Sequence, residues 1–523
     1  GPTLAIGLAG ATAGLGVLGA AEALGWEPRL LDVGSRLTGP LGSSAYLGAA
    51  LALLWPAAVG IAVDSSLGRR TRVLAGVGVA GGLVGVLGSG ARAAWVGLLV
   101  AGLVVALVRR AWLRSLLTRA RGNPLATGLG VAVALVAIVA VVLLSPVGGR
   151  AGSLFDADAP GGSGRVDEWR VAARVLADHP VTGVGPEGYR IAFGRFVDAD
   201  YEVAHGRDQL PDRAHSGPLD VALSGGIGAL AAWVLVLGLV ARSAWRVMRR
   251  GRPWLVGIAV GLVAHWVGQL FLFPLAELEP VAWLLAGLVV VEGAVPGDLR
   301  STRVSSRVVV TVGLVAWLVA VVGGVSGVAG LTADRRAEQA VQALVRGDNR
   351  VALATADAAT IWRPDVVRYR LLDARVRTNA GEGAISSLDA VDSALAVSPK
   401  DPIARLARVR YLVARAVATE IPAHARLARL AADELLRDDS VNGALWLLSG
   451  EAARLDGDAQ GAERAWLHAE HLRPHDAEPA TNLAVLYWDR GDEPAAAKAI
   501  ARALAADPAD QRALSISERV SGG

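Results

Sequence analysis

Long apolar runs recur through the first 330 residues of this chain, and short arginine-rich loops separate them. The hydrocarbon core of a bilayer is about 30 Å thick, and an α-helix needs about 20 residues to cross it. A helix also satisfies its own backbone polar groups inside a membrane. The runs therefore predict about nine transmembrane helices. Their expected ranges are 4–25, 43–63, 73–89, 93–108, 126–147, 218–241, 254–276, 280–293 and 308–330.

The arginines predict how these helices are oriented. They gather in the loops after the second, fourth, sixth and eighth expected spans, which all fall on the same side of the membrane. Basic loops stay in the cytoplasm, so the N-terminal Gly1 is expected inside. The loop 148–217 and residues 331–523 are then expected on the extracytoplasmic side.

Composition excludes several classes of function. The chain is 53% hydrophobic with a mean hydropathy of +0.43, which is too apolar for an ordinary soluble protein. Its net charge of +4 is spread over short loops rather than over one basic face, so no nucleic-acid partner is predicted. With no cysteine, disulfides and thiolate metal sites are excluded. Histidine and carboxylate spacing typical of zinc, phosphate-binding glycine loops and serine nucleophile elbows are not found, and neither a metal nor a cofactor is predicted.

The last 190 or so residues have a different pattern. Amphipathic, alanine-rich segments recur there, and the intervals 364–399 and 474–508 between closing prolines are 35 and 34 residues long. That period is typical of tetratricopeptide (TPR) repeats, which are helix pairs stacked into a solenoid. We therefore predict an all-α chain, with a transmembrane bundle over 1–330 and a TPR-like α-solenoid over 331–523. The solenoid is expected to bind a protein or glycan partner, with a simple spacer as the alternative.

The loop 148–217 is the long non-repeat segment, and loops of that length are usually functional. Residues 165–178 within it are expected to form a helix that Ser163 caps and Pro180 ends. Its predicted packing face is Val166, Trp169, Ala173 and Leu176. A glycine-rich turn over 183–188 is expected to follow.

Three residues form a candidate site at the predicted outer membrane surface. His215 directly precedes the span 218–241, where a neutral imidazole could accept a proton. Arg92 interrupts two spans and Arg165 begins the loop helix, and paired guanidinium groups suit a phosphate ligand. The alternatives are a snorkelling Arg92 and a solvated Arg165. His205 is the rival base, in a polar stretch ten residues earlier.

Short motifs over about residues 36–295 resemble the O-antigen ligase and polymerase superfamily of membrane glycosyltransferases. They are Arg36–Gly39, Ser89–Arg92, Gly164, Arg165, Trp169, His179, Pro180, Gly183, Gly185, Tyr189, Ala214, His215, Leu219 and Gly225–Gly228. The resemblance implies that Arg92 and Arg165 hold a polyprenyl diphosphate such as undecaprenyl diphosphate, that His215 activates an acceptor, and that Arg36, Trp169, Tyr189 and Ser216 support them. Ser216 departs from the asparagine common there, and four N-terminal helices of the family are expected to be missing.

The resemblance implies a metal-independent glycosyltransferase, either a ligase or a polymerase, in the bacterial cytoplasmic membrane. Its donor would be a polyprenyl-diphosphate-linked glycan, and its acceptor a hydroxyl on a glycan, lipid or protein during cell-envelope polysaccharide assembly. Two alternatives stay open. One is a polytopic transporter, although the marked residues lie at the surface rather than at the midplane. The other is a non-catalytic assembly scaffold that presents the TPR repeats.

Overall fold

The computed structural model describes residues 2–26, 36–109, 163–207, 210–294 and 306–522. Within these ranges every regular element is an α-helix or a 3-10 helix, which confirms the all-α fold class. The chain forms two compact units. The first, here the membrane unit, comprises Gly1–Tyr189 and Asp212–Ser301, and the second, here the repeat unit, comprises Arg190–Pro211 and Thr302–Gly523.

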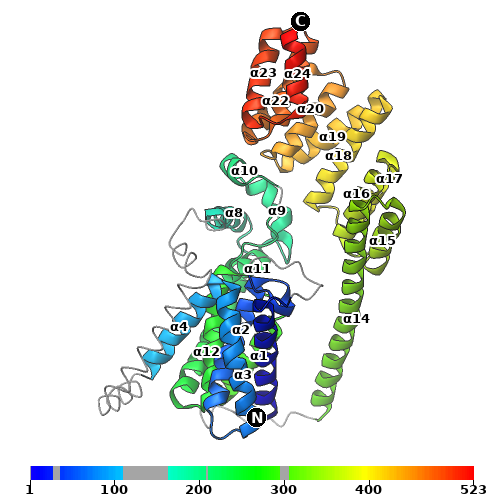
Figure 1. The fold of residues 1–523 in the computed structure, drawn as a ribbon. Coiled ribbons are helices and arrows are strands. Elements are labelled where there is room, and N and C mark those ends of the chain that lie inside the picture. The colour runs from blue at the N-terminus through cyan, green and yellow to red at the C-terminus, as the bar shows by residue number, and fades with distance from the viewer. Residues whose placement is uncertain (1, 27–35, 110–162, 208–209, 295–305, 523) are drawn as a thin grey trace. The chain divides into compact units, whose positions relative to one another are not determined.

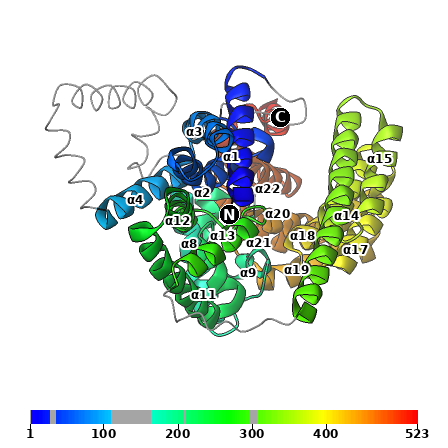
Figure 2. The same ribbon diagram turned by 90° about the horizontal axis from the view of Figure 1, so that it is seen from below.

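The membrane unit is a bundle in which α2 packs against α1, α3 and α12, and α1 packs against α3 (Figures 1 and 2). Its helices are α1 (Pro2–Ala23), α2 (Ser44–Val63), α3 (Arg69–Ser89), α4 (Arg92–Val108), α8 (Ser163–Asp178), α11 (Gly217–Arg250), α12 (Pro253–Gly268) and α13 (Glu279–Glu292), with 3-10 turns η1 (Gly39–Leu41) and η2 (Gln269–Phe271). The 34 residues of α11 extend past the span expected at 218–241.

Six helices in the described ranges are long and apolar enough to cross a membrane, so the chain is a multi-pass membrane protein. Five belong to the membrane unit, namely α1, α2, α3, α11 and α12 with η2, and the sixth lies in α14 of the repeat unit. Of the other expected spans, 93–108 corresponds to the shorter apolar helix α4 and 280–293 to the 14-residue α13. The span expected at 126–147 lies outside the described residues.

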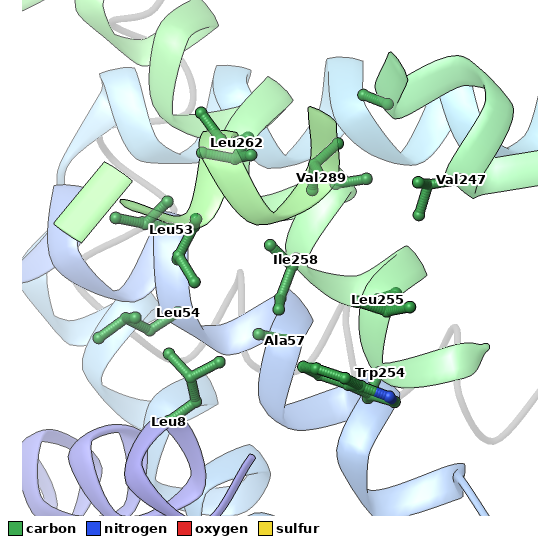
Figure 3. Packing of buried hydrophobic residues seen from close by; sticks show 14 of the residues in the cluster. Leu8, Leu53, Leu54, Ala57, Val247, Trp254, Leu255, Ile258, Leu262 and Val289 are labelled. Atoms are coloured by element: carbon green, nitrogen blue, oxygen red, sulfur yellow. The ribbon is translucent and has the colours of Figure 1, made fainter. Parts of the chain in front are cut away.

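Glycines allow the central helices to approach closely. On α12, a Cβ atom at Gly257 would lie 2.2 Å from the Pro56 carbonyl oxygen of α2, and one at Gly261 would lie 2.0 Å from the Leu53 oxygen. Small residues at such crossings let backbones touch, which is how helices associate in a membrane. Figure 3 shows the apolar cluster around this crossing, where Leu53 and Ile258 are fully buried.

The repeat unit contains five successive helix pairs and a closing helix within the described residues. The pairs are α14 (Ser306–Val345) with α15 (Asn349–Trp362), α16 (Val367–Asn379) with α17 (Gly383–Val397), α18 (Pro402–Thr419) with α19 (Pro422–Asp438), α20 (Gly443–Leu455) with α21 (Ala459–Leu472), and α22 (Ala477–Asp489) with α23 (Glu493–Ala506), followed by α24 (Gln511–Gly522). The expected closing prolines, Pro364, Pro399, Pro474 and Pro508, each follow the second helix of a pair. The TPR-like solenoid is therefore confirmed.

The division into units differs from the predicted border at residue 331. Helix α14 runs without interruption from Ser306 to Val345, so the last apolar span and the first helix of the repeats are one rod about 60 Å long at 1.5 Å per residue. The loop residues 190–211 also belong to the repeat unit, together with α10 (Ala199–His205) and most of α9 (Gly188–Phe196). Neither feature is visible in the hydropathy pattern.

Candidate functional site

A cavity of about 290 Å³ opens in the membrane unit, and three arginines line it. They are Arg36, Arg92 and Arg165, which come from separate parts of the chain. The rest of the lining is mostly small or apolar and includes Ala45, Ala49, Gly90, Ala91, Ala264 and Phe273. A cavity that combines small and apolar lining residues with a few convergent charged groups is the usual form of a small-ligand site.

Arg36 begins the turn that leads into α2. The carboxylate of Glu22 on α1 accepts hydrogen bonds from the backbone N–H groups of Thr38, at 2.9 Å, and Gly39, at 2.7 Å. The N–H of Leu37 donates to the Gly88 carbonyl oxygen of α3 at 3.1 Å. The turn is thus fixed to two helices, which holds the exposed Arg36 at the cavity.

Arg92 is the first residue of α4 and follows a tight turn. The hydroxyl of the fully buried Ser89 donates to the Val86 carbonyl at 2.9 Å, and Gly90 adopts a left-handed φ of 60°. Arg92 and the next two residues line the cavity. The N-terminal turn of a helix carries free N–H groups and a partial positive charge, so it adds to the attraction of the arginines for an anion.

Arg165 lies on α8 and is partly buried. Its Nη1 donates to the Phe271 carbonyl oxygen at 3.2 Å. Burial lowers the pKa of the Arg165 guanidinium, Glu168 raises it in part, and the charge of Arg92 lowers it further. Two guanidinium groups within electrostatic range repel each other, and an anion between them would relieve that repulsion.

His215 occupies a strained backbone position. Its φ of 52° lies in the left-handed region that residues other than glycine seldom adopt, and such strain is concentrated at functional sites. Both backbone polar groups of Ala214, the residue before it, are hydrogen-bonded to side chains. The Ala214 N–H donates to Asp220 Oδ1 of α11 at 2.9 Å, and Trp169 Nε1 of α8 donates to the Ala214 carbonyl at 2.8 Å.

The His215 ring lies between a carboxylate and an aromatic ring. Its Nδ1 is 3.4 Å from Glu168 Oε2, and its centroid is 5.4 Å from that of Phe273 in an edge-on arrangement. The Glu168 carboxylate beside it raises the pKa of His215 above its ordinary 6.5, against the opposing effects of burial and Arg165. With Nδ1 facing Glu168, Nε2 is the nitrogen left to accept a proton. His215 does not itself line the cavity, but its neighbour Phe273 does.

Helix α11 is interrupted, and at the interruption it is hydrogen-bonded to the turn after α8. At Gly226 the backbone leaves the helical conformation, with φ 73° and ψ −173°. The N–H of Ile227 then donates to the Pro180 carbonyl at 2.8 Å, and the N–H of Val184 donates to the Leu223 carbonyl at 2.6 Å. The turn thus supplies partners to backbone groups that the break leaves free, and we call this pair of bonds the latch.

The other predicted residues have supporting or separate places. Tyr189 is buried, and its hydroxyl donates to the Glu168 carbonyl at 3.0 Å. Ser216 is buried at the start of α11, where its carbonyl accepts from the Asp220 N–H at 2.8 Å. His205 belongs to the repeat unit, and its ring lies 4.7 Å from that of Tyr201.

The predicted helix at 165–178 is present as Ser163–Asp178, but its predicted packing face is wrong at two of its four positions, Val166 and Ala173. Val166 is 46% exposed and Ala173 is exposed, whereas Val171, Ala172 and Val175 are buried. The prediction assumed that this helix packs against a single core through one face. The helix instead meets both α11 and the chain around His215, so its buried positions follow those two contacts.

Sequence reasoning missed several polar residues near the cavity. Glu168 was not predicted as a site residue, although it lies three positions after Arg165, a spacing that places both side chains on one face of a helix. His265 and Gln269 of the α12 end line the cavity, and His265 Nε2 is 3.1 Å from Glu279 Oε1. Among the described residues, no group of three or more histidine and acidic side chains could hold a metal ion.

Part of the chain matches a known protein family. Residues 77–234 match the family model described as O-Antigen ligase, so the chain contains an O-antigen ligase domain. That range includes Arg92, Arg165 and His215. No curated protein matches the chain.

Several solved structures resemble part of the chain. A thermophilic TPR protein of Thermus thermophilus, TTC0263, has 21% identity and a TM-score of 0.31, over 36% of this chain and 97% of its own. MamA of Desulfovibrio magneticus RS-1 has 14% identity and a TM-score of 0.30, over 34% and 97%. The pilus biogenesis factor PilW has 15% identity and a TM-score of 0.32, over 36% and 84%.

The latch predicts that Gly226→Ala destabilises the protein. A Cβ there would lie 2.0 Å from the Val181 carbonyl oxygen, and the left-handed φ adds strain of about 1–3 kcal/mol. We expect a lower thermal midpoint in detergent by intrinsic tryptophan fluorescence. Gly228→Ala is the matched control, because a Cβ there meets nothing within 4 Å. Equal midpoints for the two variants would contradict the latch.

The contact with Glu168 predicts the titration of His215. Because the carboxylate raises the pKa, the ring stays protonated to a pH above 6.5, and Glu168→Gln leaves burial and Arg165 to lower it. We expect the midpoint of the His215 ring signal in NMR to move to lower pH in the variant. The signal is assigned as the one that disappears in His215→Ala, and an unchanged midpoint would show that Glu168 does not control it.

Proposed function

We propose that this protein transfers a glycan from a polyprenyl diphosphate carrier to an acceptor hydroxyl on the extracytoplasmic face of the membrane. The O-antigen ligase domain supports membrane glycan processing, and the donor and reaction are our proposal. The observation that carries it is the cavity where Arg36, Arg92 and Arg165 meet beside His215. The sugar and the nature of the acceptor are left open.

In the proposed reaction the acceptor oxygen attacks the anomeric carbon of the donor glycan. The bond between that carbon and the diphosphate oxygen breaks, and the hydroxyl proton passes to Nε2 of His215. The imidazolium that forms is stabilised by the Glu168 carboxylate near Nδ1. The polyprenyl diphosphate leaves with its new charge against the arginines, which keep their own charge without a metal. A single displacement of this kind inverts the anomeric configuration.

The direct test uses full-length protein in lipid vesicles with a fluorescent oligosaccharide on undecaprenyl diphosphate. One arm contains donor alone, so that a second donor molecule must serve as acceptor, and the other adds an unlabelled lipid-anchored oligosaccharide. Longer fluorescent glycans and released undecaprenyl diphosphate are expected in at least one arm. Intact donor in both arms, with these donors and acceptors, would remove the support for glycosyl transfer.

His215→Ala is expected to lower kcat by about 10²–10⁴-fold, which is the usual contribution of a general base. His205→Ala tests the rival base and should lower kcat much less than His215→Ala, because His205 packs on Tyr201 in the repeat unit. Initial rates of labelled product measure both variants. If His205→Ala lowered kcat more than His215→Ala, His205 rather than His215 would be the base.

Arg165→Ala and Arg92→Ala are each expected to lower kcat/KM by about 10–100-fold, because a hydrogen bond to a charged group contributes about 1.5–3 kcal/mol. Arg165→Lys should recover little, since an ammonium cannot bind two phosphate oxygens in a fork. Arg170→Ala on the same helix is the control, because its side chain is 66% exposed and pairs with Asp167. Binding of farnesyl diphosphate by calorimetry should weaken in the same order as kcat/KM.

A further inference from the structure

The repeat unit includes residues 190–211 of the loop 148–217, and side chains from this segment are buried in the repeat unit. Phe193 of α9 is fully buried, and Tyr201 of α10 is 7% exposed. Their rings lie 5.3 Å apart, edge to face. Residues 190–207 precede the first repeat helix by about a hundred positions in the sequence, so this is a long-range association and not a local turn.

A charged cluster fastens α10 to the repeats. The Arg207 guanidinium reaches both oxygens of Asp439, at 2.7 and 3.0 Å, and its Nε lies 2.7 Å from Glu202 Oε2. The other oxygen of Glu202 accepts from the Gly443 N–H at 3.0 Å, at the first residue of α20. The side chains of Arg207, Glu202 and Asp439 are only 5%, 2% and 11% exposed. Buried charges are retained when each has a partner, and here all three do.

A second contact fastens α9 one repeat earlier. Arg190 pairs with the buried Asp401, whose side chain also caps α18 by accepting from the Ile403 and Ala404 N–H groups at 3.0 Å. Asp439 likewise accepts from Asn442, which caps α20. The segment 190–207 therefore binds to the turns that precede α18 and α20. These turns lie at equivalent positions in two successive repeats. The arginines of the segment meet the carboxylates of these turns.

The segment 190–207 and the repeats are also closely packed, in addition to their ion pairs. At Gly194 of α9 a Cβ atom would lie 2.8 Å from the Asp439 carboxylate, so a side chain there would displace it. The Arg207 guanidinium also stacks over the Phe193 ring, with its carbon 5.6 Å from the ring centre. Close packing, aromatic stacking and paired buried charges at one place are typical of a specific interface.

We propose that residues 190–207 are an intramolecular ligand of the repeats, and that the Glu202–Arg207–Asp439 cluster positions the loop that carries His215. The positioning part rests on the proposed function, and the docking part does not. Arg207 precedes His215 by eight positions in the sequence. Because the repeats hold the chain on one side of His215, releasing it increases the number of loop conformations that must be searched before the base is in place. Arg207 and Asp439 are thus positioning residues that do not touch the substrate.

The test compares Asp439→Asn with Asp373→Asn in the full-length protein. Both carboxylates are 11% exposed and paired with an arginine, but Asp373 pairs with Arg377 inside the second helix pair, away from the segment. In hydrogen–deuterium exchange we expect Asp439→Asn to speed exchange of peptides from 190–207 by about tenfold or more. Asp373→Asn should leave those peptides unchanged.

Transfer kinetics separate positioning from plain stability. Asp439→Asn is expected to lower kcat by about tenfold or more, because small misplacements of catalytic groups are costly, while the KM for donor stays within about twofold. Asp373→Asn should change neither.

Each outcome decides one part of the proposal. Unchanged exchange in Asp439→Asn would overturn the docking. Faster exchange with unchanged kcat would overturn the positioning and leave a structural contact. If the wild-type protein showed no transfer activity, both the proposed function and the positioning would be overturned. The docking would still be established if residues 190–207 exchanged slowly in the wild-type protein and quickly in Asp439→Asn.

Discussion

The candidate site depends on the break in α11 at Gly226. A helix broken in this way leaves backbone groups without partners, which is expensive inside a membrane protein. The turn after α8 satisfies them through Pro180 and Val184, and it can approach because Gly226 has no side chain. The latch thereby fixes α8, and with it Arg165, Glu168 and Trp169, next to the start of α11 where His215 lies.

Charge then determines what this arrangement can bind. Arg92 and Arg165 are held near each other although their charges repel, and the start of α4 adds the positive end of a helix. The packing of the surrounding helices holds the two charges together, and an anionic ligand bound between them, as proposed above, would relieve the repulsion. His215, next to Phe273 at the cavity wall, has the Glu168 carboxylate on its Nδ1 side and therefore a defined nitrogen for accepting a proton.

The sequence predicted the helices and repeats well, because hydropathy and proline period each report on a local property. It also identified Arg36, Arg92 and Arg165, which the fold brings to one cavity. It did not predict Glu168 beside His215 or His265 at the cavity, because those roles come from contacts between helices distant in the chain. The packing face of α8 was wrong for the same reason, since that helix serves two neighbours and periodicity can describe only one.

The border between the two units could not be predicted from composition either. Polarity changes near residue 331, but α14 continues through that point, and residues 190–211 return to the repeats from a loop of the membrane unit. The chain therefore passes between the units at residues 189–190, 211–212 and 301–302 rather than once. A domain appended by a single linker could be removed without disturbing the loop before His215. A domain that shares this loop cannot be removed in that way, so a truncation after residue 330 would change the loop as well as any partner recognition by the repeats.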